Sequence, residues 1–185
     1  MKSKKWTLLA TSLTAMVLMA ACAQSTTTSN TNATTNSATT TATKTSQSSY
    51  FTEKDNDTSY DESTASKIEL SGSSANVSGD GVTSTVTITK SGTYVISGQS
   101  DGVQIKVEAD KSADVHLVLK GATMTNTNAA ISATSAGHVY LTLAEGTTNS
   151  LSDSSSNSDE KADAALFSKV DLTINGKGTL NVDGK

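Results

Sequence analysis

The sequence contains few of the residues that mark several common protein classes. It has one cysteine, Cys22, so it cannot form an intrachain disulfide framework. Arginine and proline are absent, and the net charge of −4 leaves no basic surface of the kind that binds nucleic acid. Aromatic residues make up only 4% of the chain. Abundant serine, threonine, asparagine and glycine disfavour a large helical core and favour either disorder or short strands with polar outer faces.

Residues 1–21 predict an export signal. Lys2, Lys4 and Lys5 form a positive region that precedes a mostly apolar stretch from residue 7 to residue 20. A stable membrane-spanning helix needs roughly 20 apolar residues, so this stretch is too short to be one. We therefore exclude these residues from the fold.

The residues around Cys22 resemble the lipobox of bacterial lipoproteins, which directs lipid to a cysteine. Residues 18–22 read Leu-Met-Ala-Ala-Cys, with Met19 where such motifs usually carry leucine. The resemblance implies that Cys22 is lipidated and becomes the mature N-terminus. We therefore expect an exported protein anchored by lipid to the outer face of the bacterial cell membrane. The alternative is an ordinary secretory signal that is cleaved nearby and gives Cys22 no role.

Residues 22–67 predict a disordered tether. Residues 25–49 are almost all serine, threonine, asparagine, alanine and glutamine, and they show no apolar periodicity. Such a segment buries too little surface to offset its conformational entropy, so it favours a flexible spacer. Tyr50, Phe51 and Tyr60 lie among acidic residues and fit either a docking peptide or a solvated linker.

Residues 68–185 carry a repeat of short alternating strands that end in glycine turns. The segments 115–121, 139–146 and 170–176 align with one another, and residues 93–98 form a weaker copy. The aligned strands begin 24 and then 31 residues apart, and a polar insertion accounts for the longer gap. A period in the low twenties with about three strands per repeat is typical of a solenoid, whose turns bury a continuous core by stacking.

The repeat predicts an all-β fold, a right-handed parallel β-helix over residues 68–185. Alternation along each strand separates inward from outward positions. One inward column is Tyr94, Leu117, Leu141 and Leu172, and the next is Ile96, Leu119, Leu143 and Ile174. The outward columns are Thr93, His116, Tyr140 and Asp171, and then Val95, Val118, Thr142 and Thr173. A β-sandwich with short alternating strands is the alternative.

The repeat segments together resemble a known family. They include Thr-Tyr-Val-Ile-Ser-Gly at 93–98, Leu-Ala-Glu-Gly-Thr at 143–147 and Asn-Gly-Lys-Gly-Thr-Leu at 175–180. The chain is similar here to the bacterial carbohydrate-binding-domain family of calcium-binding, pectate-lyase-like parallel β-helix lipoproteins. The resemblance implies binding of cellulose or acidic plant polysaccharide. Family members usually continue with further Asp-Gly-Ile turns after the position of Leu180, so we expect a β-helix truncated at its C-terminus.

The polar insertion predicts a calcium site. Calcium takes six to eight oxygen ligands, often from carboxylates in turns. The insertion offers four candidate ligands, Asp153, Asp159, Glu160 and Asp163. A solvated surface loop is the alternative interpretation.

The outward column predicts a carbohydrate-binding face. Sugar sites combine an aromatic ring with polar groups, and His116, Tyr140 and Asp171 supply both. Outward strand positions are also routinely polar or aromatic for structural reasons alone. A lyase would need a base beside a metal-neutralised acid, and pectate-lyase-like enzymes commonly use arginine, which this chain lacks.

We therefore predict a non-catalytic cell-surface lipoprotein that binds a cellulose-like or acidic plant glycan, with calcium as a candidate cofactor. Two alternatives remain open. One is a structural or adhesive surface protein without a specific glycan site, and the other is a partial polysaccharide lyase.

Overall fold

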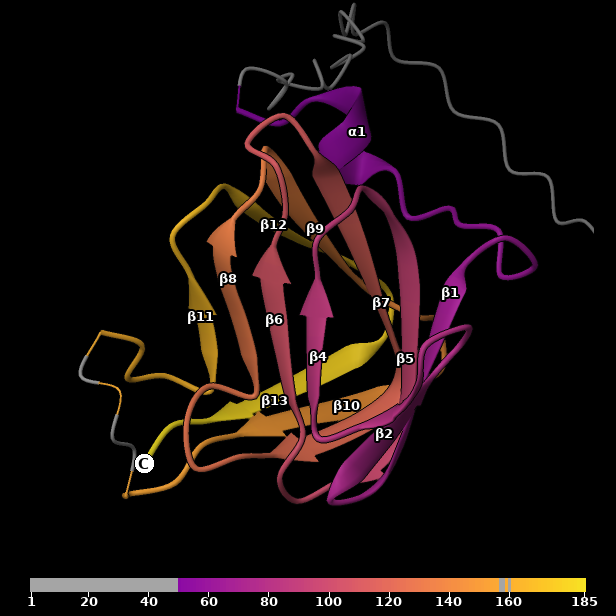
Figure 1. Cartoon of the computed structure of the whole chain (residues 1–185). Helices are drawn as coiled ribbons and strands as arrows, with labels where there is room; N and C mark the ends of the chain where they lie inside the picture. The colour runs from indigo at the N-terminus through magenta and orange to yellow at the C-terminus, as the bar shows by residue number, and fades with distance from the viewer. Residues whose placement is uncertain (1–49, 157–158, 160) are drawn as a thin grey trace, which may run out of the picture. The chain divides into compact units, whose positions relative to one another are not determined.

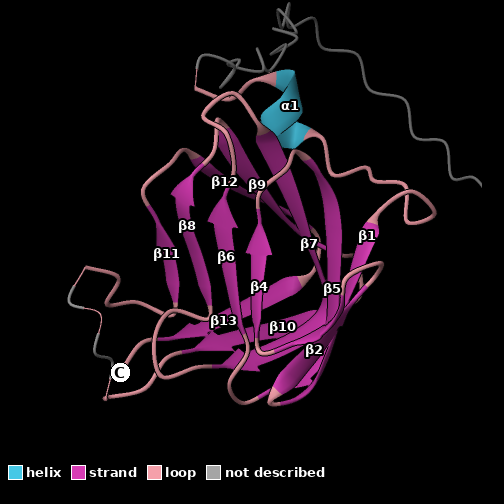
Figure 2. Ribbon diagram, in the orientation of Figure 1, coloured by secondary structure: helices cyan, strands magenta, loops and turns pink. Residues whose placement is uncertain are grey.

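The computed structural model describes residues 50–156, 159 and 161–185. The predicted signal, Cys22 and the tether up to residue 49 lie outside the described residues. The described part contains one short helix and thirteen strands (Figures 1 and 2). Their bounds are α1 (Glu53–Asn56), β1 (Ser66–Gly72), β2 (Ser74–Val77), β3 (Gly81–Thr83), β4 (Thr85–Ile88), β5 (Gly92–Ser100), β6 (Gln104–Glu108), β7 (Asp114–Thr125), β8 (Ile131–Ser135), β9 (His138–Leu143), β10 (Thr148–Ser152), β11 (Leu166–Ser168), β12 (Leu172–Gly176) and β13 (Thr179–Asp183).

The strands stack in parallel, turn upon turn. Strands β1, β5, β7, β9 and β12 pair in that order, and β4, β6, β8 and β11 form a second sheet beside them (Figure 1). Strand β10 pairs in parallel with β13 and with the end of β7, which adds a third face. Among the described strands, antiparallel pairing occurs only where β2 joins β1 and β3. This arrangement of about four turns confirms the predicted all-β parallel β-helix.

The core lies between the sheets, and its columns follow the predicted alternation through three turns. Tyr94 pairs with Leu117 and Leu117 with Leu141, while Ile96 pairs with Leu119 and Leu119 with Leu143. The four leucines are buried, and Tyr94 packs partly buried against the same core. Each turn therefore covers the apolar face of the turn before it.

The predicted register of the last turn is wrong by two residues. Leu172 pairs with Val139, and Ile174 takes the place beside Leu141. A shift of two residues keeps every side chain on its own face, so alternation alone cannot exclude it. The bend at Gly176 (φ +100°) favours the observed register, since a Cβ there would meet the backbone carbonyl of Leu143.

The two ends of the β-helix differ in the described residues. The antiparallel strands β2 and β3 extend the sheet beyond β1 at one end, and Ala75 and Val77 are buried there. At the other end no described strand stacks on the last turn, and Ile174 and Val182 are 49% and 53% exposed.

The described part of the predicted tether, residues 50–67, is not a solvated linker. Thr52 caps α1, with Asp55 completing a reciprocal capping box, and β1 already begins at Ser66. Residues 52–62, which we call the strap, contact the outer face of β7 and β12 through polar groups. The ordered chain therefore begins well before residue 68.

Core truncation tests the inward assignment. We expect Leu141→Ala to lower the free energy of unfolding by about 2–5 kcal/mol, because it leaves a cavity at a fully buried position. Thr87→Ala, on the exposed side of β4, should cost less than about 0.5 kcal/mol. Denaturant unfolding of both variants measures this difference, and similar losses would contradict the inward assignment.

Candidate functional site

The outer face of β5, β7, β9 and β12 carries rows of polar side chains set by the strand register. Thr93 pairs with His116, His116 with Tyr140, and Tyr140 with Thr173. The strap lies on this face, so several of these outward side chains are shielded from solvent. The site is therefore built from two parts of the chain that are distant in sequence.

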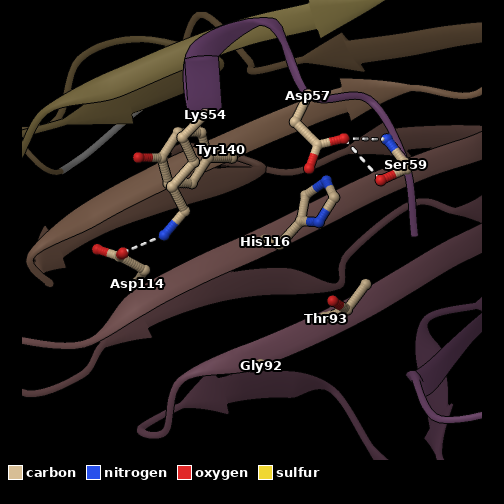
Figure 3. Close-up of a pocket in the computed structure, with 8 residues that line it drawn as sticks. All are labelled: Lys54, Asp57, Ser59, Gly92, Thr93, Asp114, His116 and Tyr140. Carbon is tan, nitrogen blue, oxygen red and sulfur yellow. Dashed lines mark hydrogen bonds and ion pairs between the residues drawn. The ribbon is translucent and has the colours of Figure 1, made fainter. Parts of the chain in front are cut away.

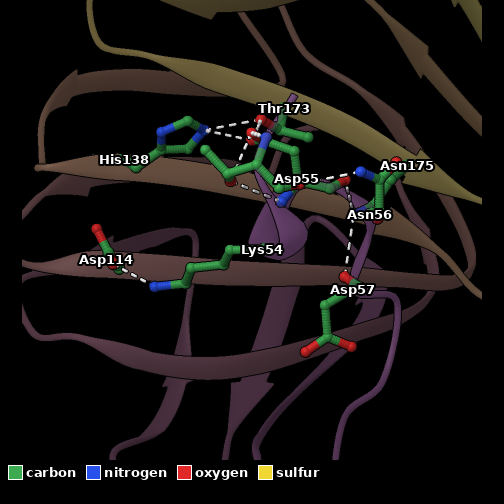
Figure 4. Close-up of polar contacts among 9 residues, drawn as sticks. Lys54, Asp55, Asn56, Asp57, Asp114, His138, Thr173 and Asn175 are labelled. Carbon is green, nitrogen blue, oxygen red and sulfur yellow. Dashed lines mark hydrogen bonds and ion pairs between the residues drawn. The ribbon is translucent and has the colours of Figure 1, made fainter. Parts of the chain in front are cut away.

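Asp55 attaches the strap to the last strand. The hydroxyl of Thr173 donates a hydrogen bond of 2.5 Å to Asp55 Oδ1, and the side chain of Asp55 is only 11% exposed (Figure 4). The backbone N–H and the hydroxyl of Thr52 each donate to Asp55 Oδ2 at 2.8 Å. These donors, Thr173 first, lower the pKa of Asp55 to about 2.

A hydrogen-bonded chain continues across the face to His116. Asn175 Nδ2 donates to the backbone carbonyls of Asp55 (3.1 Å) and Asp57 (3.0 Å), so its Oδ1 is left to accept from the hydroxyl of Thr142 at 2.6 Å. Thr142 has one proton and has given it to Asn175. The 2.7 Å contact between His116 Nε2 and Thr142 Oγ1 therefore requires a proton on Nε2.

The proton on the His138 ring is placed in the same way. Thr173 gives its only hydroxyl proton to Asp55, so His138 Nε2 must donate to Thr173 Oγ1 across 2.8 Å. The His138 ring stacks on Tyr140 with centroids 4.2 Å apart and planes 13° from parallel. Both imidazoles are thus oriented by threonine hydroxyls on the neighbouring turn.

Tyr140 lies at the centre of the covered region. Tyr140 is 8% exposed, and burial raises the pKa of its phenol. The ammonium of Lys54 lies 4.9 Å from the ring centroid and forms an ion pair with Asp114, whose hydrogen bond raises the pKa of Lys54. Burial lowers the pKa of His116, an effect partly opposed by the nearby carboxylate of Asp57.

Two of the cavities that border both the strap and the sheet lie beside Tyr60 and Tyr140. The first has a volume of about 240 Å³ (Figure 3). It is lined by Lys54, Asp57, Ser59, Gly92, Thr93, Asp114, His116 and Tyr140. The second has a volume of about 340 Å³. It is lined by Thr58, Tyr60, Lys120, Thr142, Leu143, Ala144, Glu145, Thr147, Gly176 and Lys177.

The structure brings together two of the three residues predicted to bind carbohydrate. His116 and Tyr140 are register neighbours and line the first cavity. Asp171 does not join them. It directly precedes Leu172, which pairs with Val139, so Asp171 lies level with His138. Asp171 is exposed and lines neither cavity.

Sequence reasoning missed the strap residues of the first cavity, Lys54, Asp57 and Ser59. They fall in the segment assigned to the tether. Their only signal was the change from the Ser/Thr-rich stretch to mixed charged and aromatic residues after residue 49.

The predicted calcium ligands do not converge in the described part of the insertion. Asp153 is buried, at 3% exposure, and its Oδ1 accepts the backbone N–H of Lys185 at 2.8 Å. Asp159 and Asp163 are exposed, and Glu160 lies outside the described residues. Among the residues described, no three acidic, histidine or cysteine side chains gather closely enough to hold a metal ion. These residues alone therefore do not fit a calcium site.

The helical part of the described chain offers no membrane span, since none of it is long and apolar enough to cross a bilayer.

Comparison with known proteins identifies relatives of the β-helix. The model of a family described as carbohydrate-binding domain-containing protein matches residues 82–185. A protein of the same description from Acetivibrio thermocellus is 39% identical over 104 residues, which are 53% of this chain and 36% of that protein. A solved structure of a polysaccharide lyase-like protein from C. thermocellum, a gadolinium derivative, is 36% identical with a TM-score of 0.56. The match covers 63% of this chain and 51% of the solved chain. This chain therefore spans about half the length of the solved chain, and 36% of the Acetivibrio thermocellus protein.

Titration of Asp55 tests how the strap is held. Because the pKa of Asp55 in the folded protein is about 2, below the usual 3.8, its carboxylate stabilises the docked strap fully above pH 3.8. That stabilisation is lost as the pH falls through about 2. A carbon NMR titration of the Asp55 carboxyl group should show this low midpoint, and Thr173→Val should move it toward 3.8. A midpoint near 3.8 in the unchanged protein would contradict the contact.

Proposed function

This chain belongs to the family of carbohydrate-binding domain-containing proteins, and we propose that it binds polysaccharide without cleaving it. The observation that carries the proposal is the first cavity, in which the strap and three strands place aromatic, carboxylate, imidazole, hydroxyl and ammonium groups around one small space. Its volume of about 240 Å³ is below the range of about 300–1,000 Å³ that is common for pockets for drug-sized ligands. It suits a single sugar unit of a longer chain.

The groups in the cavity match the chemistry of sugar hydroxyls, which both donate and accept hydrogen bonds. The carboxylates of Asp57 and Asp114 accept, and the ammonium of Lys54 donates. The hydroxyl of Thr93 can do either, whereas that of Ser59 donates to Asp57 Oδ1 at 2.6 Å and is left to accept. Tyr140 adds apolar surface. Few, well-placed polar groups around an aromatic ring are a common design of small-molecule sites.

Lys54, the lysine that lines the first cavity, is poorly suited to act as the base of a lyase. A lyase base must accept a proton near neutral pH. Lys54 is a poor base because the hydrogen bond from its ammonium to Asp114 raises its pKa. The Nε2 atom of His116 carries a proton that it donates to Thr142, so Nδ1 is the ring nitrogen that could accept one. The description of the solved relative as lyase-like supports catalysis as a second candidate function, which release of unsaturated sugars absorbing ultraviolet light would reveal.

We also propose where the protein is located and which ligands it binds. The lipobox-like segment supports export and a lipid anchor at Cys22, which would hold the domain at the outer face of the cell membrane. Cellulose-like and acidic plant glycans are both proposed ligands. Calcium dependence is proposed from the resemblance to a calcium-binding family, and not from the arrangement of the described residues.

Paired aspartate variants test the binding site. We expect Asp114→Ala to weaken binding about tenfold or more, because a hydrogen bond to a charged group contributes about 1.5–3 kcal/mol. Asp171→Ala, outside the cavities, should leave affinity within about twofold. Calorimetric titration with cello-oligosaccharides and oligogalacturonides, with and without a chelator, measures both effects and tests calcium dependence. Equal losses in the two variants would place the site elsewhere, and no binding to either glycan would overturn the proposed function.

Fractionation of cells tests the proposed anchor. Cys22→Ser should leave the protein unprocessed or release it into the medium, because no other cysteine can accept the lipid. Ser25→Ala, close by in the chain, should stay in the membrane fraction. Normal processing and membrane retention of the Cys22 variant would rule out the lipoprotein assignment.

A further inference from the structure

The strap divides the outer face of the sheet into two separate compartments. It is held on β7 through the pairs Lys54–Asp114 and Glu62–Lys120. On β12 it is held by Thr173 and Asn175, which bond to Asp55 and to the backbone of Asp55 and Asp57 (Figure 4). One cavity uses Lys54, Asp57 and Ser59 as walls, and the other uses Thr58 and Tyr60. From Asp57 to Tyr60, successive strap residues therefore line alternate cavities.

A flat polymer surface requires a flat binding surface with exposed rings. The aromatic rings that line the two cavities, Tyr140 and Tyr60, do not provide one. Tyr140 is 8% exposed, with His138 stacked on it and Lys54 above it. Tyr60 belongs to the strap and meets the His116 ring edge-on, at 89° and a centroid distance of 6.4 Å. An approaching crystalline surface would contact the strap before it reached the sheet.

From this geometry we infer that the strap makes the site selective for single, soluble glycan chains over the surface of a crystalline or insoluble polysaccharide. The inference rests on the proposed function and names the physical form of the ligand. A free chain can place individual sugar units in the cavities on either side of the strap. A chain packed in a crystal cannot leave its neighbours to do so.

The attachment of the strap can be weakened at residues that line neither cavity. Asp55 and Thr173 line neither cavity, yet their 2.5 Å hydrogen bond joins the strap to β12. The helix α1 contributes no buried residue, so its docking depends on polar contacts. Thr173→Val removes the hydroxyl and keeps the shape of the side chain, whereas Asp55→Asn removes the charge from the other side of the same contact.

The test compares two physical forms of the same sugar. Cellohexaose is paired with microcrystalline cellulose, and a soluble oligogalacturonide is paired with insoluble pectate. We expect the full chain to bind the soluble member of at least one pair. Less than about a tenth of the protein should sediment with the insoluble member of that pair. Thr173→Val and Asp55→Asn should each raise the sedimented fraction several-fold, because an opened strap exposes Tyr140. Thr87→Val, on a different sheet, is the matched control and should behave like the unchanged chain.

The outcomes separate this inference from the proposed function. Strong retention of the unchanged chain on the insoluble member of the pair that it binds would overturn the selectivity and leave glycan binding in place. Unchanged retention by both strap variants, with circular dichroism melting curves that show them folded, would overturn the role of the strap. Binding to neither member of either pair would overturn the proposed function, and the inference with it.

Discussion

The hydrogen-bonded register between successive turns is the constraint on which the rest of the structure depends. A single turn cannot bury its own apolar side, so each strand needs its parallel neighbour for both backbone pairing and core contact. Once Leu117 pairs with Leu141, the outward residues next to them along each strand are placed as well, so His116 must lie beside Tyr140. The polar face is therefore a consequence of the same register that builds the core.

The outward face is unusual because part of it is buried by the chain's own N-terminal segment. Thr142 points away from the core and is nevertheless 1% exposed, because His116, Asn175 and the strap surround it. No fully buried side-chain nitrogen or oxygen in this chain of contacts lacks a hydrogen-bond partner, which is the condition under which buried polar networks are tolerated. The network fixes both imidazoles as Nε2–H donors, and one of them, His116, lines the first cavity.

Much of the fold could be predicted from sequence, because stacked strands leave a period and an alternation that can be read directly. Leu117 and Leu141 are inward for that reason. Leu172 was assigned to the wrong row because a two-residue shift preserves alternation, and only the bend at Gly176 distinguishes the registers. Asp171 was misplaced by the same error.

The strap could not be predicted, because its contacts join residues far apart in sequence and leave no periodic signal. Examples are the hydrogen bond between Asp55 and Thr173 and the packing of Tyr60 against the apolar cluster that includes Val118. The central claim is that a glycan binds between the strap and the sheet. Intermolecular nuclear Overhauser effects between a bound oligosaccharide and the protein test it most directly. The account predicts contacts from the same sugar unit to Ser59 on the strap and to the Tyr140 ring on β9. Contacts confined to the sheet of β4, β6, β8 and β11, or to β10 and β13, would contradict it.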